Sequence, residues 1–96
     1  MRTRDKNYAD YGLDKKSVKA LLQLCRDTRY YHILSESAQE VYPMIALELT
    51  NSLHLGWSWE TLDTKKYVPI DSNSFYGYRR KTLWVFAQKI KERGIL

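Results

Sequence analysis

The sequence predicts an all-α fold, a compact bundle of four to five helices formed by one domain of 96 residues. Apolar residues recur at spacings of three and four through most of the chain, which is the period of an amphipathic helix. No stretch alternates apolar and polar residues as a half-buried strand would. Hydrophobic residues make up 44% of the chain and charged residues 28%, which suits a single modest core.

Capping residues mark where the first helices begin. Residues 1–12 are polar and basic without a period, so we expect a flexible N-terminal arm, followed by one helical domain over residues 13–96. Asp14 is the expected N-cap of a first helix over residues 15–26. A second helix is predicted over residues 29–41, after a short break.

The third predicted helix, residues 43–55, is the element that we expect to be most buried. Pro43 suits its first turn, and Gly56 suits its C-terminal stop. Ile45, Leu49 and Leu53 recur in it at four-residue spacing, and we expect Met44, Ala46 and Leu47 to widen this apolar stripe.

Two more helices follow. Ser58 is the expected N-cap of a short fourth helix that ends near residue 66. Asp71 or Ser72 caps a last helix over residues 74–93, and Pro69 prevents the intervening segment from continuing as a helix.

The last helix has an apolar face and a polar, cationic face. Trp84 is the exception on the cationic face, and it either packs under the N-terminal segment or anchors a protein partner. The apolar face consists of Phe75, Thr82, Leu83, Phe86 and Ile90 with Arg79 at its edge, and the opposite face of Asn73, Gly77, Arg80, Lys81, Trp84, Gln88 and Lys91.

Charge and cysteine content narrow the function classes. The net charge is +5, with the positive surplus in residues 1–27 and 57–96, which favours an anionic partner. Cys25 is the only cysteine, so an intramolecular disulfide is excluded, and its place on an apolar stripe predicts a buried thiol. No apolar run is long enough for a membrane span or a signal peptide, so we expect a cytoplasmic protein.

We expect no enzymatic activity, no cofactor and no metal site. His32 and His54 are far apart in the sequence and lack the context of a nucleophile or a metal cluster. Glu36 and Glu40 share a helix face but have no third ligand, so we expect an ordinary solvated pair.

Two stretches carry a resemblance, Trp59-Glu60-Thr61-Leu62 and Ile70-Asp71-Ser72-Asn73-Ser74-Phe75-Tyr76-Gly77-Tyr78-Arg79-Arg80-Lys81-Thr82-Leu83. Together they are similar to the helix-turn-helix of small phage regulators of the ArpU and RinA type, which resemble the promoter-reading region of sigma factors. The resemblance implies a phage or mobile-element transcriptional regulator with a helix-turn-helix-like part at residues 57–93. Asp63 or Thr64 replaces the usual small residue of the first helix, and Tyr67-Val68-Pro69 replaces the usual turn glycine.

In this interpretation the last helix enters the major groove of double-stranded DNA. Polar groups at its start read base edges, cations further along bind phosphates, and the cations Arg2, Arg4 and Lys6 of the arm enter a minor groove. A homodimer would add specificity, because one helix in one groove gives little. The predicted DNA-contacting residues are Ser72, Asn73, Ser74, Tyr76, Arg79, Arg80 and Lys81, with Lys65 and Lys66 at the end of the preceding helix.

A second interpretation uses the same basic and aromatic surface for a protein partner. A small mobile-element protein could dock on an acidic host protein, such as an RNA polymerase or a nucleic-acid enzyme that it inhibits, and its charge would steer association. Trp84 and Gln88 are the residues that we expect at such an interface. The sequence alone leaves both interpretations open.

Overall fold

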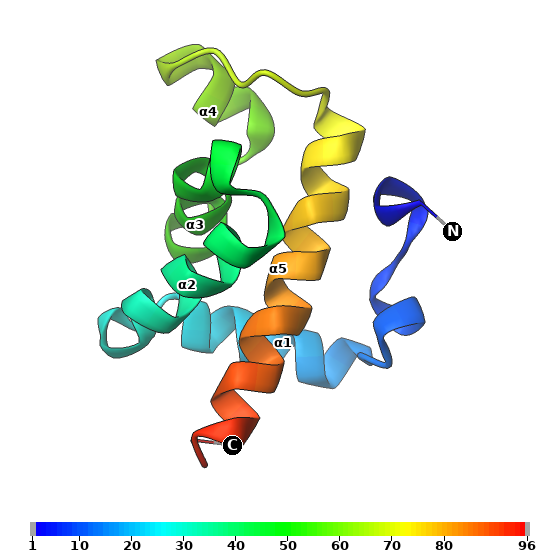
Figure 1. Cartoon of the computed structure of the whole chain (residues 1–96), viewed down its shortest axis with the longest axis vertical. Helices are drawn as coiled ribbons and strands as arrows, with labels where there is room; N and C mark the ends of the chain where they lie inside the picture. Colours follow the sequence, from blue (N-terminus) through cyan, green and yellow to red (C-terminus); the bar gives the residue numbers. More distant parts are fainter. Residues whose placement is uncertain (1, 96) are drawn as a thin grey trace.

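The computed structural model describes residues 2–95, and helices are the regular secondary structure found within that range (Figure 1). An all-α fold is therefore confirmed. The α-helices are α1 (Lys15–Cys25), α2 (Tyr31–Val41), α3 (Ala46–Leu55), α4 (Trp59–Lys65) and α5 (Ser72–Glu92), and the short 3₁₀ helices are η1 (Thr3–Asp5), η2 (Tyr8–Tyr11), η3 (Thr28–Tyr30) and η4 (Pro43–Ile45).

The expected helix boundaries are confirmed where a local signal sets them. The side chains of Asp14, Ser58 and Asp71 each accept the backbone N–H three residues further on, at 2.7, 3.2 and 3.3 Å. Gly56 ends α3 with a φ of 75°, a left-handed conformation that glycine adopts without strain. The second and third predicted helices begin their α-helical part later than expected, because η3 and η4 form their first turns.

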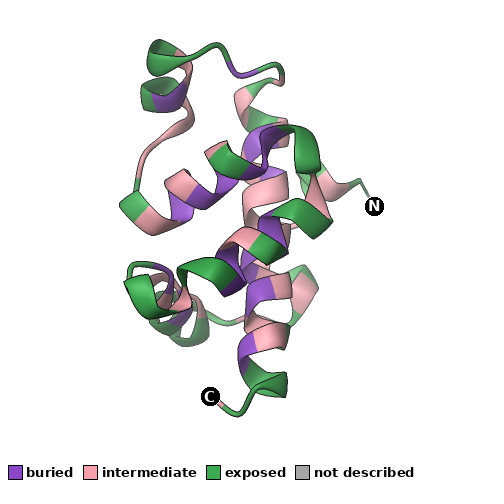
Figure 2. Ribbon diagram, turned by 60° about the vertical axis from the view of Figure 1, so that its left-hand side comes forward, coloured by how far each residue is buried: buried purple, intermediate pink, exposed green. Residues whose placement is uncertain are grey.

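Helix α5 is the element around which the others are arranged. In Figure 1, α2 and α3 lie on one side of α5, the N-terminal segment lies on the other, and α1 crosses it near its C-terminal half. Figure 2 shows the buried positions of α5 recurring along its length. The predicted core stripe of α5 is confirmed, since Phe75, Thr82, Leu83, Phe86 and Ile90 are all buried.

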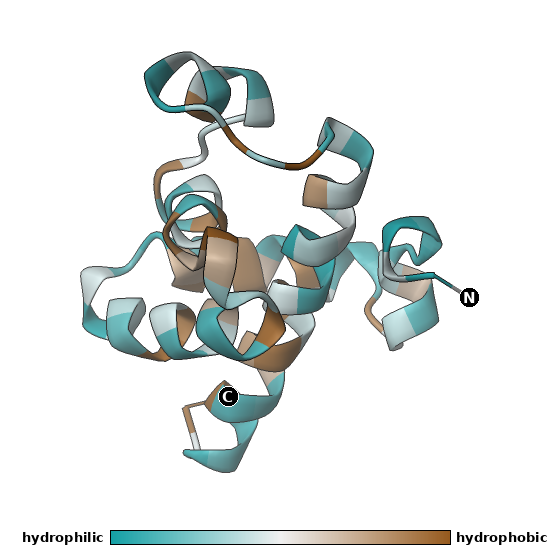
Figure 3. Ribbon diagram, turned by 45° about the horizontal axis from the view of Figure 1, so that its top comes forward, coloured by the Kyte–Doolittle hydropathy of each residue, from teal (hydrophilic) through white to brown (hydrophobic). Residues whose placement is uncertain are grey.

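The hydrophobic core has two parts, and α5 contributes to both. Apolar segments gather where α2, α3 and α5 meet, and the link from α4 to α5 is partly apolar (Figure 3). The first part, shared with α1, contains Leu21, Cys25, Ile33, Leu34, Leu53, Leu83, Phe86 and Ile90. The second, shared with α4 and the following link, contains Ala38, Ile45, Ala46, Leu49, Leu62, Val68 and Phe75.

Helix α3 buries a larger share of its residues than the other α-helices, but two assignments to its buried stripe are wrong. Met44 is 75% exposed and Leu47 is 62% exposed. Leu47 stands two residues before the buried Leu49, and residues two apart on a helix do not share a face. Met44 belongs to the 3₁₀ turn η4, where the α-helical spacing does not apply.

Residues 2–12, expected as part of a flexible arm, lie against α5 and are called the N-terminal strap below. Gly77 permits this contact, because a Cβ at its position would lie 2.5 Å from the Cα of Arg4 and 2.9 Å from the carbonyl oxygen of Thr3. Within the strap, the side chain of Asn7 and that of Asp10 each accept the other's backbone N–H, which closes a capping box on η2.

Arg80 fastens the strap from the next turn of α5. Its Nε donates to the carbonyl oxygen of Lys6 at 2.6 Å, and its Nη2 donates to that of Arg4 at 3.1 Å. A hydrogen bond from a charged donor stabilises a fold by about 1.5–3 kcal/mol. The chain therefore folds its N-terminus back over the face of α5 that lies opposite the core stripe.

Replacing Gly77 with alanine should displace the strap while leaving the helical core folded. Alanine favours a helix over glycine by about 1 kcal/mol, so α5 itself should not weaken. The new methyl group would overlap the backbone of Arg4. We expect faster hydrogen exchange at the amides of Gly12 and Leu13, which donate within this segment, and unchanged exchange in the core.

The control is Asn73→Ala, an exposed position of α5 that also gains helix propensity. Equal exchange at Gly12 in the Gly77→Ala and Asn73→Ala variants would show that Gly77 is not what admits the strap.

Candidate functional site

Three of the predicted DNA-contacting residues form side-chain hydrogen bonds within the fold, and the Nζ of Lys65 lies 4.8 Å from the centroid of the Trp57 ring. The hydroxyl oxygen of Tyr76 accepts the backbone N–H of Trp59 at 3.0 Å, which joins α5 to α4. Arg79 donates from Nε to the hydroxyl of Ser52 at 2.8 Å, so its head group is turned toward α3. Arg80 fastens the strap through the two carbonyl oxygens named above. These side chains are therefore engaged before any partner arrives.

The other predicted DNA-contacting residues lie at or near the surface, spread over two helices. The first turn of α5 and the end of α4 carry most of them, and one stands on the flank of α5 a turn beyond Gly77. They are Ser72, Asn73 and Ser74, then Lys65 and Lys66, and finally Lys81.

Helices α4 and α5 form a pair, joined by residues 66–71. This link is longer than the turn of about three to four residues in a typical helix-turn-helix. Asp63 organises it, since its Oδ1 accepts the backbone N–H of Val68 at 2.9 Å. The indole N–H of Trp59 donates to the carbonyl oxygen of Ile70 at 3.0 Å. The strap covers the middle of the outer face of α5 at Gly77, while Asn73, Gln88 and Lys91 on the same face remain exposed.

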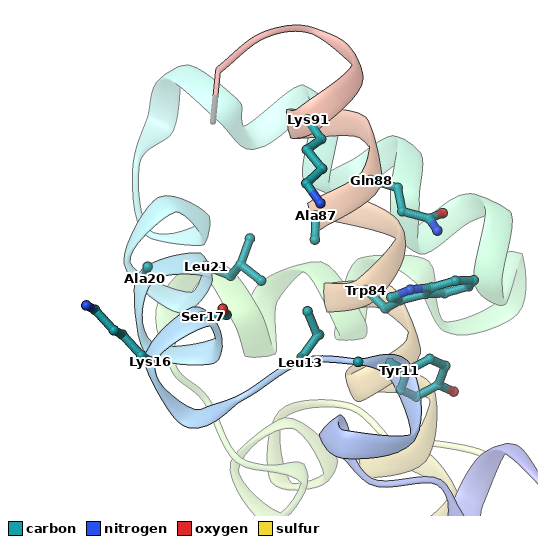
Figure 4. A pocket seen from close by; sticks show the side chains of 11 residues that line it. Tyr11, Leu13, Lys16, Ser17, Ala20, Leu21, Trp84, Ala87, Gln88 and Lys91 are labelled. Atoms are coloured by element: carbon teal, nitrogen blue, oxygen red, sulfur yellow. The ribbon is translucent and has the colours of Figure 1, made fainter.

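A groove between α1 and α5 lies beside the strap (Figure 4). It has a volume of about 510 Å³, within the range of about 300–1,000 Å³ of many ligand sites. Figure 4 shows Leu13 and Leu21 pointing into it, with Trp84 and Tyr11 side by side at one end. Its lining residues are Tyr11, Gly12, Leu13, Lys16, Ser17, Ala20, Leu21, Trp84, Ala87, Gln88 and Lys91.

The strap fixes the position of the Trp84 indole. The ring centroids of Tyr11 and Trp84 are 5.2 Å apart with 32° between the planes, and the Nζ of Lys6 lies 5.2 Å from the Tyr11 centroid. Burial raises the pKa of the Tyr11 hydroxyl, with a smaller opposite effect from Arg80. Trp84 thus packs against the N-terminal segment, one of the two roles expected for it, while its half-exposed ring also lines the groove.

Among residues 2–95, the charged residues that line the groove are two lysines, and no carboxylate side chain lines it. Lys16 comes from α1, and Lys91 extends above Ala87 on α5 (Figure 4). Neither has an ion-pair partner among residues 2–95. Lys89 and Arg93, near Lys91, differ because each is paired with a carboxylate of α2. Lys16 and Lys91 are therefore the groove cations whose charge is available to a partner.

The two carboxylates expected as a solvated pair take part in tertiary contacts. Glu40 accepts from the Nζ of Lys89 at 3.0 Å, and Glu36 accepts from the Nη2 of Arg93 at 2.9 Å. The carboxylate of each ion pair is solvent-exposed, so each pair contributes about 0–1 kcal/mol to stability. They tie the end of α5 to α2.

The groove is only partly visible in the sequence. Trp84 and Gln88, the residues expected at a partner interface, both line it. Tyr11, Leu13 and Lys16 are not expected there, because they come from the other end of the chain. The sequence feature that indicates the groove is the large aromatic residue Trp84 on an otherwise polar helix face. Such a residue is expected to pack against another segment, and the apolar stripes of the predicted helices do not provide one.

In the part of the chain that the structure describes, His54 makes a structural contact and no group of side chains suits a metal ion. The Nδ1 of His54 lies 2.7 Å from the carbonyl oxygen of Cys25, a distance at which the ring N–H donates. Among residues 2–95, no three His, Cys, Asp or Glu side chains gather as metal ligands would. Within the same range, every helix is too short or too polar to cross a membrane.

No family model, curated protein or solved structure matches the chain. The likeness to phage regulators therefore stays a prediction from the sequence. Function has to follow from the geometry of the groove and of the surface around α5.

Burial of Cys25 should make its thiol unreactive in the native protein. Desolvation raises its pKa from 9.0 to about 12, against a smaller opposing effect of Arg79 and Arg26. Because the thiolate is the reactive form, an aromatic disulfide reagent should label native protein far more slowly than urea-unfolded protein at about pH 8. Equal labelling rates would contradict the burial.

The same shift predicts the effect of alkaline pH on stability. The unfolded thiol loses its proton at a lower pH than the native thiol, so the native state binds more protons in that interval. The free energy of unfolding should therefore fall as the pH rises from 9.0 toward about 12, and substituting Cys25 with alanine should flatten that part of the profile.

Proposed function

We propose that this chain is a small protein-binding module that receives an acidic segment of a partner protein in the groove between α1 and α5. The observation that carries the proposal is the composition of this groove. An indole and aliphatic side chains line it, and in the part of the chain that the structure describes its charged lining residues are both cationic, with no carboxylate side chain among them. Apolar pockets with a few polar groups are the usual form of binding sites.

Trp84 is the proposed anchor of the interface. Tryptophan is enriched among residues whose truncation costs an interface about 2 kcal/mol or more. Here the ring is already ordered by Tyr11, so binding would cost little side-chain entropy. An aromatic anchor surrounded by a polar rim matches the general anatomy of protein interfaces.

Lys16 and Lys91 indicate that the proposed partner segment is acidic. Neither lysine has an ion-pair partner among the described residues, and the net charge of the chain is +5. An acidic surface would therefore be attracted before contact. An acidic host protein, such as the RNA polymerase or nucleic-acid enzyme considered from the sequence, is a partner of this class.

Affinity capture with matched variants tests the proposal. Immobilised wild-type chain and the variants Trp84→Ala and Tyr67→Ala are exposed to the same extract. Tyr67 is 78% exposed and does not line the groove, so it controls for removal of a surface aromatic ring. We expect a protein that the wild type and Tyr67→Ala retain and Trp84→Ala loses. With the purified partner, Trp84→Ala should weaken Kd about thirtyfold, the equivalent of about 2 kcal/mol.

Circular dichroism must show the same helicity in all three proteins, so that a missing interaction is not a folding defect. A partner retained equally by all three proteins would place the interface elsewhere and would rule out the groove as the docking site.

A second candidate function, binding to double-stranded DNA, is favoured by the contact between the strap and α5. The backbone of Arg4 touches Gly77, so two elements that are distant in the sequence, the arm and the last helix, lie side by side. Their cations Arg2, Arg4 and Lys81 then belong to neighbouring segments of one surface. Such a cluster suits phosphate contacts more than base reading.

A mobility-shift series at increasing salt tests this candidate, with Arg2, Arg4 and Lys81 replaced together by alanine. Arg80 bonds to backbone carbonyl oxygens, so the strap should stay docked after these substitutions. We expect weaker binding to any DNA sequence and a log–log salt slope reduced by about 0.9 for each phosphate that the variant no longer neutralises. The control Lys15→Ala with Lys19→Ala removes charge from exposed positions of α1. An equally weakened shift in this control would reject the strap surface.

A further inference from the structure

We propose that the occupant of the α1/α5 groove is an amphipathic α-helix whose apolar ridge is flanked by acidic side chains. This inference rests on the proposed docking function and adds the conformation and the residue pattern of the partner segment. It follows from three properties of the groove: the pairing of its backbone, the size of its lining residues and the position of its charges.

The backbone around the groove favours a helical partner. The lining residues Ala20, Leu21 and Ala87 lie in the interiors of α1 and α5, where backbone N–H and C=O groups are already paired within each helix. An extended peptide lying in this groove would bury amide groups without partners. A helix satisfies its own amide groups, so it can bury one apolar face there at no such cost.

The lining residues also allow a helix to approach closely. Ser17 and Ala20 on α1 and Ala87 on α5 have small side chains, the buried Leu21 points from α1 toward α5, and Trp84 stands at one end of the groove (Figure 4). Helices pack with their axes about 8–10 Å apart, and small side chains at the contact allow the closer distances in this range. The volume of about 510 Å³ is enough for several apolar side chains and not for a whole helix. One face of the partner would therefore enter, with anchors spaced three and four residues apart.

The two lysines of the groove indicate which residues should flank the apolar face of the partner helix. Lys16 stands on α1 and Lys91 on α5, so the two cations come from opposite walls of the groove. Acidic residues on both sides of the apolar ridge would meet them, whereas basic residues would be repelled. The predicted pattern is apolar at i, i+3 or i+4, and i+7, with Asp or Glu on both flanks.

A displayed library of random peptides of roughly 16 residues, long enough for about four helical turns, tests the inference. The full chain is the bait, and Trp84→Ala is the counter-selection bait. A second counter-selection uses Lys16→Glu with Lys91→Glu, whose side chains lie at the rim, so that folding is not at issue. We expect enriched peptides with the predicted pattern, which gain helicity on binding and lose affinity at least tenfold toward both variant baits.

The outcomes separate this inference from the proposed function. Peptides that depend on Trp84 but are extended, proline-rich or flanked by basic residues would overturn the acidic helix and leave a docking groove. An absence of Trp84-dependent enrichment would overturn both. Peptides with the predicted spacing whose affinity is equal for the charge-reversed bait would overturn the acidic flanks, and with them the inference as stated.

Discussion

Helix α5 is packed on two opposite faces, and both contacts are needed to define this small domain. Its inner stripe, with Phe75, Leu83 and Phe86 fully buried, supplies both parts of the core. Its outer face receives the strap at Gly77 and Arg80. Truncating a buried phenylalanine costs about 3–5 kcal/mol, which is a large part of the stability of an ordinary domain. A helix so enclosed acts as a scaffold, and its side chains reach partners only where the enclosing segments leave gaps.

The groove is such a gap, and the strap builds one of its walls. Arg80 and Gly77 position η1, the capping box of Asn7 orders η2, and η2 delivers Tyr11 to the face of Trp84. The path from a backbone contact at one end of α5 to an ordered indole further along the helix is continuous and local at each step. The proposed binding site is therefore a product of N-terminal folding rather than an independent surface of α5.

The sequence was sufficient for features whose cause is local. Caps such as Asp14 and Asp71 and the core stripe of α5 depend on residues within a few positions, so periodicity and capping rules found them. The strap could not be found in this way, because it has no period and Arg80 bonds to a carbonyl oxygen 74 residues away. For the same reason a sequence cannot tell a free cation from one already bonded within the fold. The groove required both ends of the chain to be placed together.

The strap is coupled to the groove, because Tyr11 and Gly12 of the strap line it. None of its residues is fully buried, and the Tyr11 hydroxyl is buried without a hydrogen-bond partner among the described residues, which costs about 1–3 kcal/mol. Any occupant that contacts Tyr11 and Gly12 binds the docked strap and not the released one. By linkage, binding of the occupant must then stabilise the docked strap. The same coupling free energy is lost from the binding of the occupant when a change releases the strap. Gly77 and Arg80 consequently bear on binding without touching the occupant, which distinguishes them from Trp84, Lys16 and Lys91.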